Sequence, residues 1–497
     1  MYSTQGTRSL LWALACGFNI AIVSVSAFNP DSFENAGVTR TIDLGGSLTQ
    51  VTTTYAVRAL ANNLDQYFIA LSDEEERYTT WIDAKLKGQS DTLELKRHGF
   101  NPRSHAFLYS INLQKNLKNN QTANIVVSTV QSHASTPLPA TAAQGDPQSL
   151  MYQTPLYVLS PYKSVVQRTK IRSSTPMIHS YTDSKDLSEY VEAGSSAVTK
   201  TGATLVYGPF HNVPASSNLP FQEKKQKTVS VHYDHDQPVL TVASLQRSAE
   251  ISHWGANLNI HDEIVLRNDG PTLKGHFSRL EHQSQVYFKR QAPHVMKELV
   301  LHLPAGARDP YFIDLVGNVS TSHFRPAPPI SAALLSPSKA KSSILELRPR
   351  YPLLGGWNYT FTLGYDTPLE NAAKYDASTG KYVVAIPYLT NVPGAAFEET
   401  ELKIILPEGA RDVTLHTPFG PDSIENERHV TYLDTTGRPA MVLKKKNLSD
   451  KHAGTIYVTY SLSTATHFKK PIAVTSAALA LFTFALGARR LDLALHK

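Results

Sequence analysis

The densest group of side chains that could bind a metal lies at residues 232–236. His232, Asp234, His235 and Asp236 are separated by a single tyrosine, and imidazole and carboxylate groups are ligands that zinc accepts. In a strand, His232, Asp234 and Asp236 would share one face. A polar turn that opens the next strand, QPVLTVASL at 237–245, explains the same residues. We favour the turn because metal ligands more often come from separate elements, and a metal-dependent hydrolase remains the alternative.

Two further patterns could support chemistry. Ser252, His253 and Trp254 are consecutive, which suggests a nucleophile beside its base, but adjacent residues of a strand point to opposite faces. The heptad LPAGARD at 303–309 returns as LPEGARD at 406–412, and its Arg–Asp pairs could clamp a charged ligand. Each copy follows an alternating strand and contains proline and glycine, which favour a chain reversal. We therefore expect scaffold turns with a local ion pair in both copies.

Composition and motif content argue against several other kinds of site. The sequence contains no HExxH, GxSxG, Walker or GxGxxG motif, so metal, nucleophile and phosphate sites have no local support. The single cysteine, Cys16, lies near the N-terminus, in a segment that we expect to be removed. The net charge of +6 includes cations at both ends of the chain and predicts no nucleic-acid partner. We predict no catalytic residue, no cofactor and no bound metal.

Apolar segments at the two ends set the expected topology. The uncharged run from Leu10 to Val25 precedes small residues, which is the layout of a secretory signal with cleavage after Ala27. Ile472–Ala488 also carries no charge and would cover about 26 Å as a helix, close to the thin membrane of the endoplasmic reticulum. Basic pairs on both flanks suit lipid headgroups better than a protein core. A retained signal anchor and a buried soluble helix are the respective alternatives.

This topology places the bulk of the chain in the lumen, where asparagine can be glycosylated. Four acceptor sequons lie there, at Asn120, Asn318, Asn358 and Asn447, and we expect some of them to be occupied. Without Cys16 the mature chain has no disulfide, so its fold must depend on packing in large cores.

Most of the lumenal sequence alternates between apolar and polar residues with a period of two, which predicts half-buried antiparallel strands. The clearest examples are Val51 to Ala59, Leu299 to Leu303, Leu402 to Leu406 and Ile456 to Leu462. The predicted fold class is mainly β, with two tandem β-sandwich-like lumenal domains and one C-terminal transmembrane helix. We place a signal peptide at 1–27, the lumenal domains at 28–225 and 226–468, the membrane helix at 471–488 and a short cytosolic tail at 489–497.

Local signals predict some of the connections. Asn268-Asp-Gly270 lies between two strand-like segments and predicts a hairpin. Short helices are expected within 74–86 and 184–193, where the pattern is amphipathic. The segments 132–148, 214–227 and 325–341 are rich in proline or polar residues and predict exposed loops, the second of them near the domain boundary.

An ordered series of longer motifs resembles the ribophorin I family. The series consists of YGPFHNVPA at 207–215, HY at 232–233, ISHWG at 251–255, LKGHFSR at 273–279, LVGNVSTSH at 315–323, LRPRYPLLGGW at 347–357, LKIILPEGA at 402–410, TYLDTTGRP at 431–439 and KKN at 445–447. The resemblance covers roughly residues 30 to 490 and is strongest from 200 to 450. The end of the chain is similar to the short-tailed, fungal type of the family.

The resemblance implies a non-catalytic, single-pass lumenal subunit of the oligosaccharyltransferase complex in the endoplasmic reticulum membrane. It implies a role in transferring a dolichol-linked oligosaccharide to Asn-x-Ser/Thr of nascent polypeptides, with catalysis in another, multi-spanning subunit. The expected partners are the other subunits, including that catalytic one, the nascent acceptor polypeptides and the membrane. A lumenal metal-dependent hydrolase and a cell-surface adhesion module are the alternatives from other classes.

Overall fold

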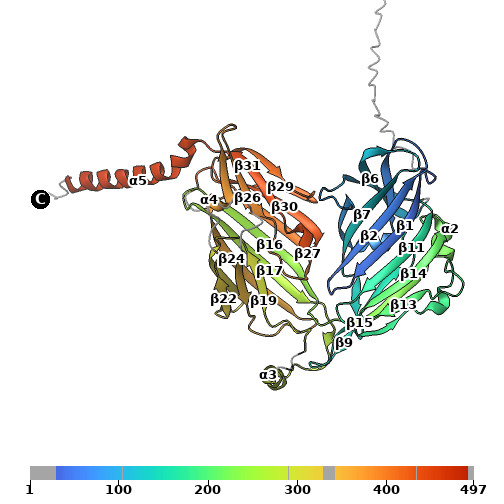
Figure 1. Ribbon diagram of the computed structural model, residues 1–497. Coiled ribbons are helices and arrows are strands. Elements are labelled where there is room, and N and C mark those ends of the chain that lie inside the picture. Colours follow the sequence, from blue (N-terminus) through green and yellow to red (C-terminus); the bar gives the residue numbers. More distant parts are fainter. Residues whose placement is uncertain are drawn as a thin grey trace, which may run out of the picture.

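The computed structural model describes residues 29–102, 104–288, 290, 292–327, 342–431 and 434–490. These residues form two β-rich bodies and a long C-terminal helix that projects from the second body (Figure 1). The predicted mainly β class with two sandwich-like bodies and an apolar C-terminal helix is therefore confirmed. The expected signal peptide, with cleavage after Ala27, lies outside the described residues.

The first body consists of one large sheet and two smaller sheets. The large sheet has the order β13-β14-β11-β1-β2-β7-β4, formed by Val198–Thr201, Thr204–Val213, Ser164–Arg172, Phe33–Asp43, Leu48–Ala59, Thr122–Ser132 and Thr79–Leu86. One small sheet has the order β3-β6-β5, formed by Leu64–Leu71, Ala106–Leu117 and Leu95–Asn101. The other has the order β12-β15-β10-β8, formed by Ile178–Tyr181, Thr228–Asp234, Ser149–Pro155 and Ser135–Pro137.

The second body repeats this plan. Its large sheet has the order β21-β20-β24-β17-β16-β27-β30-β29, formed by Gly317–Asn318, Arg308–Asp314, Asn358–Pro368, Asn257–Asn268, Leu240–Ser252, Ala396–Ile405, Arg438–Leu448 and Ser423–His429. The smaller sheets have the orders β19-β23-β22, formed by Leu299–Leu303, Ser343–Leu347 and Ser322–Arg325, and β25-β26-β31-β28, formed by Ala373–Asp376, Lys381–Pro387, Thr455–Ser461 and Arg411–His416.

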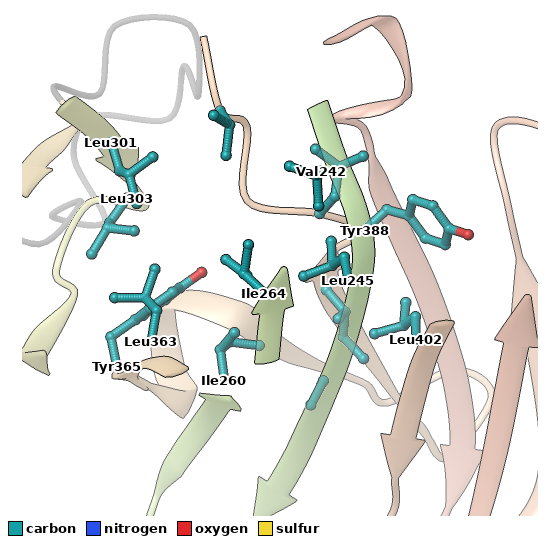
Figure 2. Close-up of a cluster of buried hydrophobic side chains, with 14 of the residues drawn as sticks. Val242, Leu245, Ile260, Ile264, Leu301, Leu303, Leu363, Tyr365, Tyr388 and Leu402 are labelled. Atoms are coloured by element: carbon teal, nitrogen blue, oxygen red, sulfur yellow. The ribbon is translucent and has the colours of Figure 1, made fainter. Parts of the chain in front are cut away.

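Alternation along the strands produces the cores, as the sequence predicts. Val51, Tyr55 and Val57 on one face of β2 are all buried. In the second body a single cluster joins side chains of all three sheets. Figure 2 shows Leu301 and Leu303 of β19 on one side of this core and Val242, Leu245 and Leu402 on the other. Burial of such side chains contributes roughly 1.5–3 kcal/mol each.

An ion pair is buried inside the second core. The guanidinium of Arg247 on β16 donates to both carboxylate oxygens of Asp262 on β17 at 2.6 Å, and both side chains are inaccessible to solvent. Arg247 also donates to the carbonyl of Pro387 at 2.8 Å, and Thr390 donates to Asp262 at 2.7 Å. The hydrogen-bonding groups of the pair are thus largely satisfied, which a buried pair requires.

The two bodies meet through backbone as well as side chains. β9 (Thr141–Ala142) of the first body pairs in parallel with β18 (Thr272–Leu273) of the second. The hairpin expected at Asn268-Asp-Gly270 is wrong, although the turn itself forms. The Asn268 side chain accepts from the amide of Gly270 at 3.0 Å, as in a turn, but β18 then crosses to β9 and does not pair with β17.

Two predictions are revised, one of an exposed loop and one of the domain boundary. The segment 132–148 contains β8 and β9 and has several buried residues, so it is not simply an exposed loop. β15 begins after the boundary expected at 225/226, yet it pairs with β10 and β12 of the first body. We therefore propose a boundary between residues 234 and 240.

Among the described residues, the helices are short except for the last. They are α1 (Asp73–Tyr78), α2 (Leu219–Lys224), α3 (Arg279–Tyr287), α4 (Leu369–Ala372) and α5 (Thr464–Arg490), with 3-10 turns at Ser184–Asp186 and Asp450–His452. The helix expected within 74–86 is confirmed only for its first part, because β4 follows at Thr79. The helix expected within 184–193 is only a 3-10 turn.

Candidate functional site

The residues of the possible metal site form hydrogen bonds with different partners. His232 Nε2 lies 3.0 Å from Ser149 Oγ, whereas Asp234 Oδ1 lies 2.5 Å from Nε2 of His179. His235 is buried, and burial lowers the pKa of its imidazole. Within the described part of the chain, no group of three or more His, Cys, Asp or Glu side chains could hold a metal ion. The hydrolase hypothesis has no support from this geometry.

Ser252 and His253 also have separate partners. The Ser252 hydroxyl accepts from the amide of Gly255 at 2.9 Å, and His253 Nε2 lies 2.8 Å from the hydroxyl of Tyr460. Burial, followed by the nearby imidazole of His467, lowers the pKa of His253. Ser252 therefore stabilises the turn between β16 and β17, whereas His253 contacts β31. As expected, the two residues do not form a nucleophile with its base.

The two heptads adopt the same backbone turn. Gly306 and Gly409 have φ of 78° and 82°, and the final residues Asp309 and Asp412 have φ of 50° and 51°. In each copy the amide of the fifth residue donates to the carbonyl of the proline at 3.2 Å. Each heptad thus connects two strands, β19 to β20 and β27 to β28. The prediction that the repeat is architecture is confirmed.

The local ion pair expected in each heptad is wrong. Both heptads lie wholly in the described ranges, and neither shows an ion pair between its arginine and its aspartate. The Asp412 carboxylate instead accepts from the hydroxyl of Ser461 on β31 at 2.9 Å. The strand register shifts at the end of each heptad, between Arg308 and Tyr311 and between Arg411 and Thr414, as at a β-bulge.

The copies differ at the third residue, where Ala305 is replaced by Glu408. The Glu408 carboxylate accepts from the amides of Thr435 and Thr436 at 3.1 and 2.8 Å, from their hydroxyls at 2.7 and 2.8 Å, and from Lys469 at 3.3 Å. Burial alone would raise the pKa of this carboxyl, but these donors outweigh burial and lower the pKa to about 2. Lys469 belongs to α5, so the second heptad holds the C-terminal helix.

A second carboxylate holds the next lysine. Asp434 accepts from Lys470 and from the hydroxyl and amide of Thr431, at 2.6 and 2.7 Å for the last two. The Asp434 side chain is inaccessible to solvent. Burial would raise its pKa, yet the hydrogen bonds from Lys470 and Thr431 bring the pKa below its usual range. The lumenal basic pair, expected to face headgroups, is therefore bound by protein carboxylates.

The third contact satisfies a carbonyl that a proline leaves free. Pro471 lies inside α5 and has no amide hydrogen for the carbonyl of His467, four residues earlier. The indole Nε1 of Trp254, in the turn between β16 and β17, donates to that carbonyl at 2.9 Å. The Trp254 and His467 rings also stack, with centroids 5.0 Å apart and planes within 11°.

Close packing completes these contacts. A Cβ added to Gly409 would overlap the Cγ2 of Thr466 in the first turn of α5. We call Trp254, Glu408, Gly409 and Asp434, with the α5 residues Thr466, His467, Lys469 and Lys470, the juxtamembrane clasp. Its lumenal members follow β16, follow β27 and precede β30, which are neighbours in one sheet. Three adjacent strands thus hold the start of one helix.

The helix held by the clasp is long and apolar enough to cross a membrane. α5 comprises 27 residues, and none of its apolar stretch is buried within the described chain. It begins seven residues before the expected start at 471, because the clasp lies on its first two turns. At 1.5 Å per residue it extends about 40 Å.

Comparison with known proteins assigns the chain to a family. The family model described as Ribophorin I matches residues 33–489. The chain belongs to the ribophorin I family. A Caenorhabditis elegans relative, "Dolichyl-diphosphooligosaccharide--protein glycosyltransferase subunit 1", is 30% identical over 478 residues, which is 96% of this chain and 75% of the relative. Subunit 1B of Oryza sativa subsp. japonica is 30% identical, covering 79% and 75% of the two chains.

The ribophorin I match spans both bodies and nearly all of α5. Similarity to solved structures is much weaker. Leukotriene A4 hydrolase from Saccharomyces cerevisiae is 10% identical with a TM-score of 0.26, covering 46% of this chain and 34% of the hydrolase. That level of likeness supports no argument about fold or function.

The four sequons of this ribophorin I family member lie on the surface. Asn120, Asn318, Asn358 and Asn447 are all exposed, and Asn447 lines a cleft between the two bodies. Asn120 and Asn447 have positive φ, of 63° and 52°. Their occupancy stays a prediction, as does cleavage after Ala27.

Proposed function

We propose that this chain is the non-catalytic subunit of the oligosaccharyltransferase complex that supports transfer of a dolichol-linked oligosaccharide to Asn-x-Ser/Thr of nascent polypeptides. The family match over residues 33–489 is the observation that carries the proposal. Relatives named as subunits of dolichyl-diphosphooligosaccharide–protein glycosyltransferase, 30% identical over most of the chain, support it. The role belongs to protein N-glycosylation in the endoplasmic reticulum.

The geometry fits a subunit that positions others and does not itself catalyse. The histidines and carboxylates that could do chemistry are engaged in separate structural contacts. The clasp instead joins a large lumenal sheet to a membrane helix through two lysine–carboxylate pairs and one indole hydrogen bond. A rigid connection of this kind holds lumenal surface at a fixed height above the bilayer, where the other subunits can bind it.

The same arrangement supports a single-pass protein of the endoplasmic reticulum membrane. The lumenal bodies precede α5, and Arg489 and Arg490 follow its apolar part. Because Lys469 and Lys470 precede the span, basic pairs flank both of its ends and do not decide its orientation, which depends instead on the expected N-terminal signal. The short-tailed, fungal type remains part of the proposal, and mass spectrometry of the C-terminal peptide of the endogenous protein tests it.

Direct contact with the acceptor polypeptide is a further part of the proposal. A cleft of about 560 Å³ between the two bodies is lined by Trp81, Arg97 and Tyr109 of the first and by Asp422 and Lys446 of the second. Aromatic and charged groups together suit an extended polypeptide of mixed sequence. A photocrosslinker at position 81 is expected to label stalled glycosylation substrates. As a control, a photocrosslinker at exposed position 375 of the second body, outside the cleft, is expected not to label them.

Depletion and copurification test the assignment to the complex. Depletion of the chain should increase the mobility of secreted glycoproteins on gels, because sequons are skipped, and re-expression should restore it. Pulldown from digitonin-solubilised membranes should recover the other subunits, including the multi-spanning catalytic one. Unchanged glycoprotein mobility together with a chain that runs alone in digitonin would remove the proposal.

The two alternatives make different predictions. A metal-dependent hydrolase requires about one zinc per purified chain and loss of that zinc in His235→Ala. A cell-surface adhesion module requires export, so its glycans would become resistant to endoglycosidase H. The proposed function predicts no stoichiometric zinc and glycans that stay sensitive to the enzyme.

A further inference from the structure

A pocket of about 470 Å³ opens beside the juxtamembrane clasp. One wall is the turn between β16 and β17, with Ser252, His253 and Trp254. The opposite wall is α5, which contributes His467, Lys470, Pro471 and Val474 among others. These four α5 residues follow the spacing i, i+3, i+4 and i+7, so they form one stripe along the helix. Neither the clasp nor the proposed function explains why this space is open.

The position of the pocket along α5 indicates which molecules reach it. Lys470 is the last charged residue before the apolar span, and Val474 lies one turn further into it. The pocket therefore crosses the boundary between the headgroups and the hydrocarbon of the lumenal leaflet. Trp254 is 56% exposed, although it is a large aromatic residue. Exposed tryptophan is typical of side chains at this depth of a bilayer, where the surrounding molecules are lipids.

The charges around the pocket are balanced in pairs. Arg438 pairs with Glu250, Lys470 with Asp434 and Lys469 with Glu408. An anionic headgroup would have to compete with these carboxylates for each cation. A headgroup that carries both charges finds complementary partners, because the side chains of Glu250 and Lys470 remain 39% and 32% exposed. An ammonium group can also contact the exposed side of the Trp254 ring, which attracts cations.

We propose that this pocket binds the headgroup of a zwitterionic glycerophospholipid. Its ammonium group lies against Trp254 and Glu250, its phosphate lies against Lys470, and one acyl chain descends past Val474. The bound lipid fills the space between the lumenal sheet and the membrane helix. The proposal depends on the membrane topology of α5 and not on glycosyl transfer, so lipid binding and glycosylation are tested separately.

Lipid retention by the full chain tests the proposal. The chain is purified in mild detergent, delipidated, and offered phosphatidylcholine, phosphatidylethanolamine and phosphatidylserine in equal amounts. Retained lipid is then counted by native mass spectrometry. We expect about one phosphatidylcholine or phosphatidylethanolamine per chain. Val474→Trp places an indole in the pocket and should reduce retention at least fivefold. Leu479→Trp adds the same side chain to α5 outside the pocket and should leave retention unchanged.

Three results would overturn the proposal: no retained lipid, equal retention by Val474→Trp and Leu479→Trp, or retention of phosphatidylserine in place of the zwitterionic lipids. A second variant guards against misfolding of Val474→Trp. Trp254→Leu keeps an apolar wall but removes the ring that contacts the ammonium group, and it should lower retention of phosphatidylcholine relative to Trp254→Phe, which loses the same hydrogen bond to the His467 carbonyl but keeps an aromatic ring.

Occupancy in the membrane is tested without purification. Val474→Cys provides a thiol at the lower edge of the pocket, which can carry a photoactivatable label. Crosslinking to choline or ethanolamine lipid supports the proposal, whereas quantitative crosslinking to another protein shows that a neighbouring helix occupies the pocket and overturns it.

Discussion

The two copies of the heptad share a backbone but differ in what they hold. Residues 303–309 and 406–412 have the same turn, the same positive φ at glycine and aspartate, and a following bulge. Only the second copy carries a carboxylate at its third position, and that carboxylate binds Lys469 of α5. The same turn serves as scaffold in both heptads, and in the second heptad it also attaches the membrane helix. Shared geometry therefore does not imply a shared role.

The largest expected effect is that of Glu408→Ala. It removes the acceptor of the Thr435 and Thr436 amides and hydroxyls and leaves Lys469 unpaired. Hydrogen bonds to an ionised group contribute about 1.5–3 kcal/mol, so we expect loss of this set to lower the protection of the 463–470 amides in hydrogen exchange by about 3 kcal/mol. Ala305→Glu, the reverse change in the first copy, should alter stability by less than about 0.5 kcal/mol. If Glu408→Ala and Ala305→Glu had equal effects on stability, the proposed difference between the two heptads would be contradicted.

A somewhat smaller effect is expected for Gly409→Ala. The new Cβ meets a φ of 82° and the Cγ2 of Thr466, and together these should cost about 2 kcal/mol in chemical denaturation of the full chain. Gly306→Ala, at a φ of 78°, measures the conformational cost in the other copy. Adding Thr466→Ser to Gly409→Ala should recover the part of the lost stability that comes from the clash with Cγ2. If stability does not recover, the clash with Thr466 is not the cause of the loss.

Low pH should weaken the contacts of the Glu408 carboxylate in the second heptad, and the first heptad has no corresponding carboxylate. The folded-state pKa of Glu408 is about 2, below the ordinary 4.5. A lowered pKa contributes stability that is fully present above about pH 4.5 and is lost as pH falls towards about 2. The difference in melting temperature between the wild type and Glu408→Gln should therefore shrink over this window. A difference that stays constant from pH 6 to pH 3 would mean that the ionised carboxylate is not what matters.

The smallest expected effect is that of Trp254→Phe. It removes one hydrogen bond, to the His467 carbonyl, and keeps an aromatic ring over His467. We expect about 1 kcal/mol less protection at the base of α5 and no change at the first heptad. Phe468→Leu, an apolar change next to the stacked pair, serves as the control. Full protection in Trp254→Phe would show that solvent or lipid satisfies the carbonyl equally well.

The sequence predicts the strands better than the connections between them. Burial on one face imposes a period of two, so β2, β19, β27 and β31 could be identified from residue type alone. The turn at Asn268-Asp-Gly270 was also visible, but its following strand pairs with β9, more than a hundred residues away. Local turn chemistry does not encode that choice. The helix at α1 ends early because Thr79 and Thr80 begin a strand that pairs with β7.

The juxtamembrane clasp was only partly predictable. Its signals are present in the sequence, since Glu408 replaces Ala305, two lysines precede the membrane span, and Pro471 must free the carbonyl of His467. What the sequence lacks is the pairing of these groups. That pairing depends on β16, β27 and β30 being neighbours in one sheet, which is a property of the tertiary fold.

The contact between Trp254 and the proline-freed carbonyl has a mechanical consequence. A pull on α5 within the membrane is transmitted through this hydrogen bond and the two lysine pairs to β16, β27 and β30 at once. Because these strands lie side by side, the load is shared among three neighbouring strands and the backbone hydrogen bonds between them. A bilayer that thickens or tilts the helix would therefore move the second lumenal body as one rigid lever.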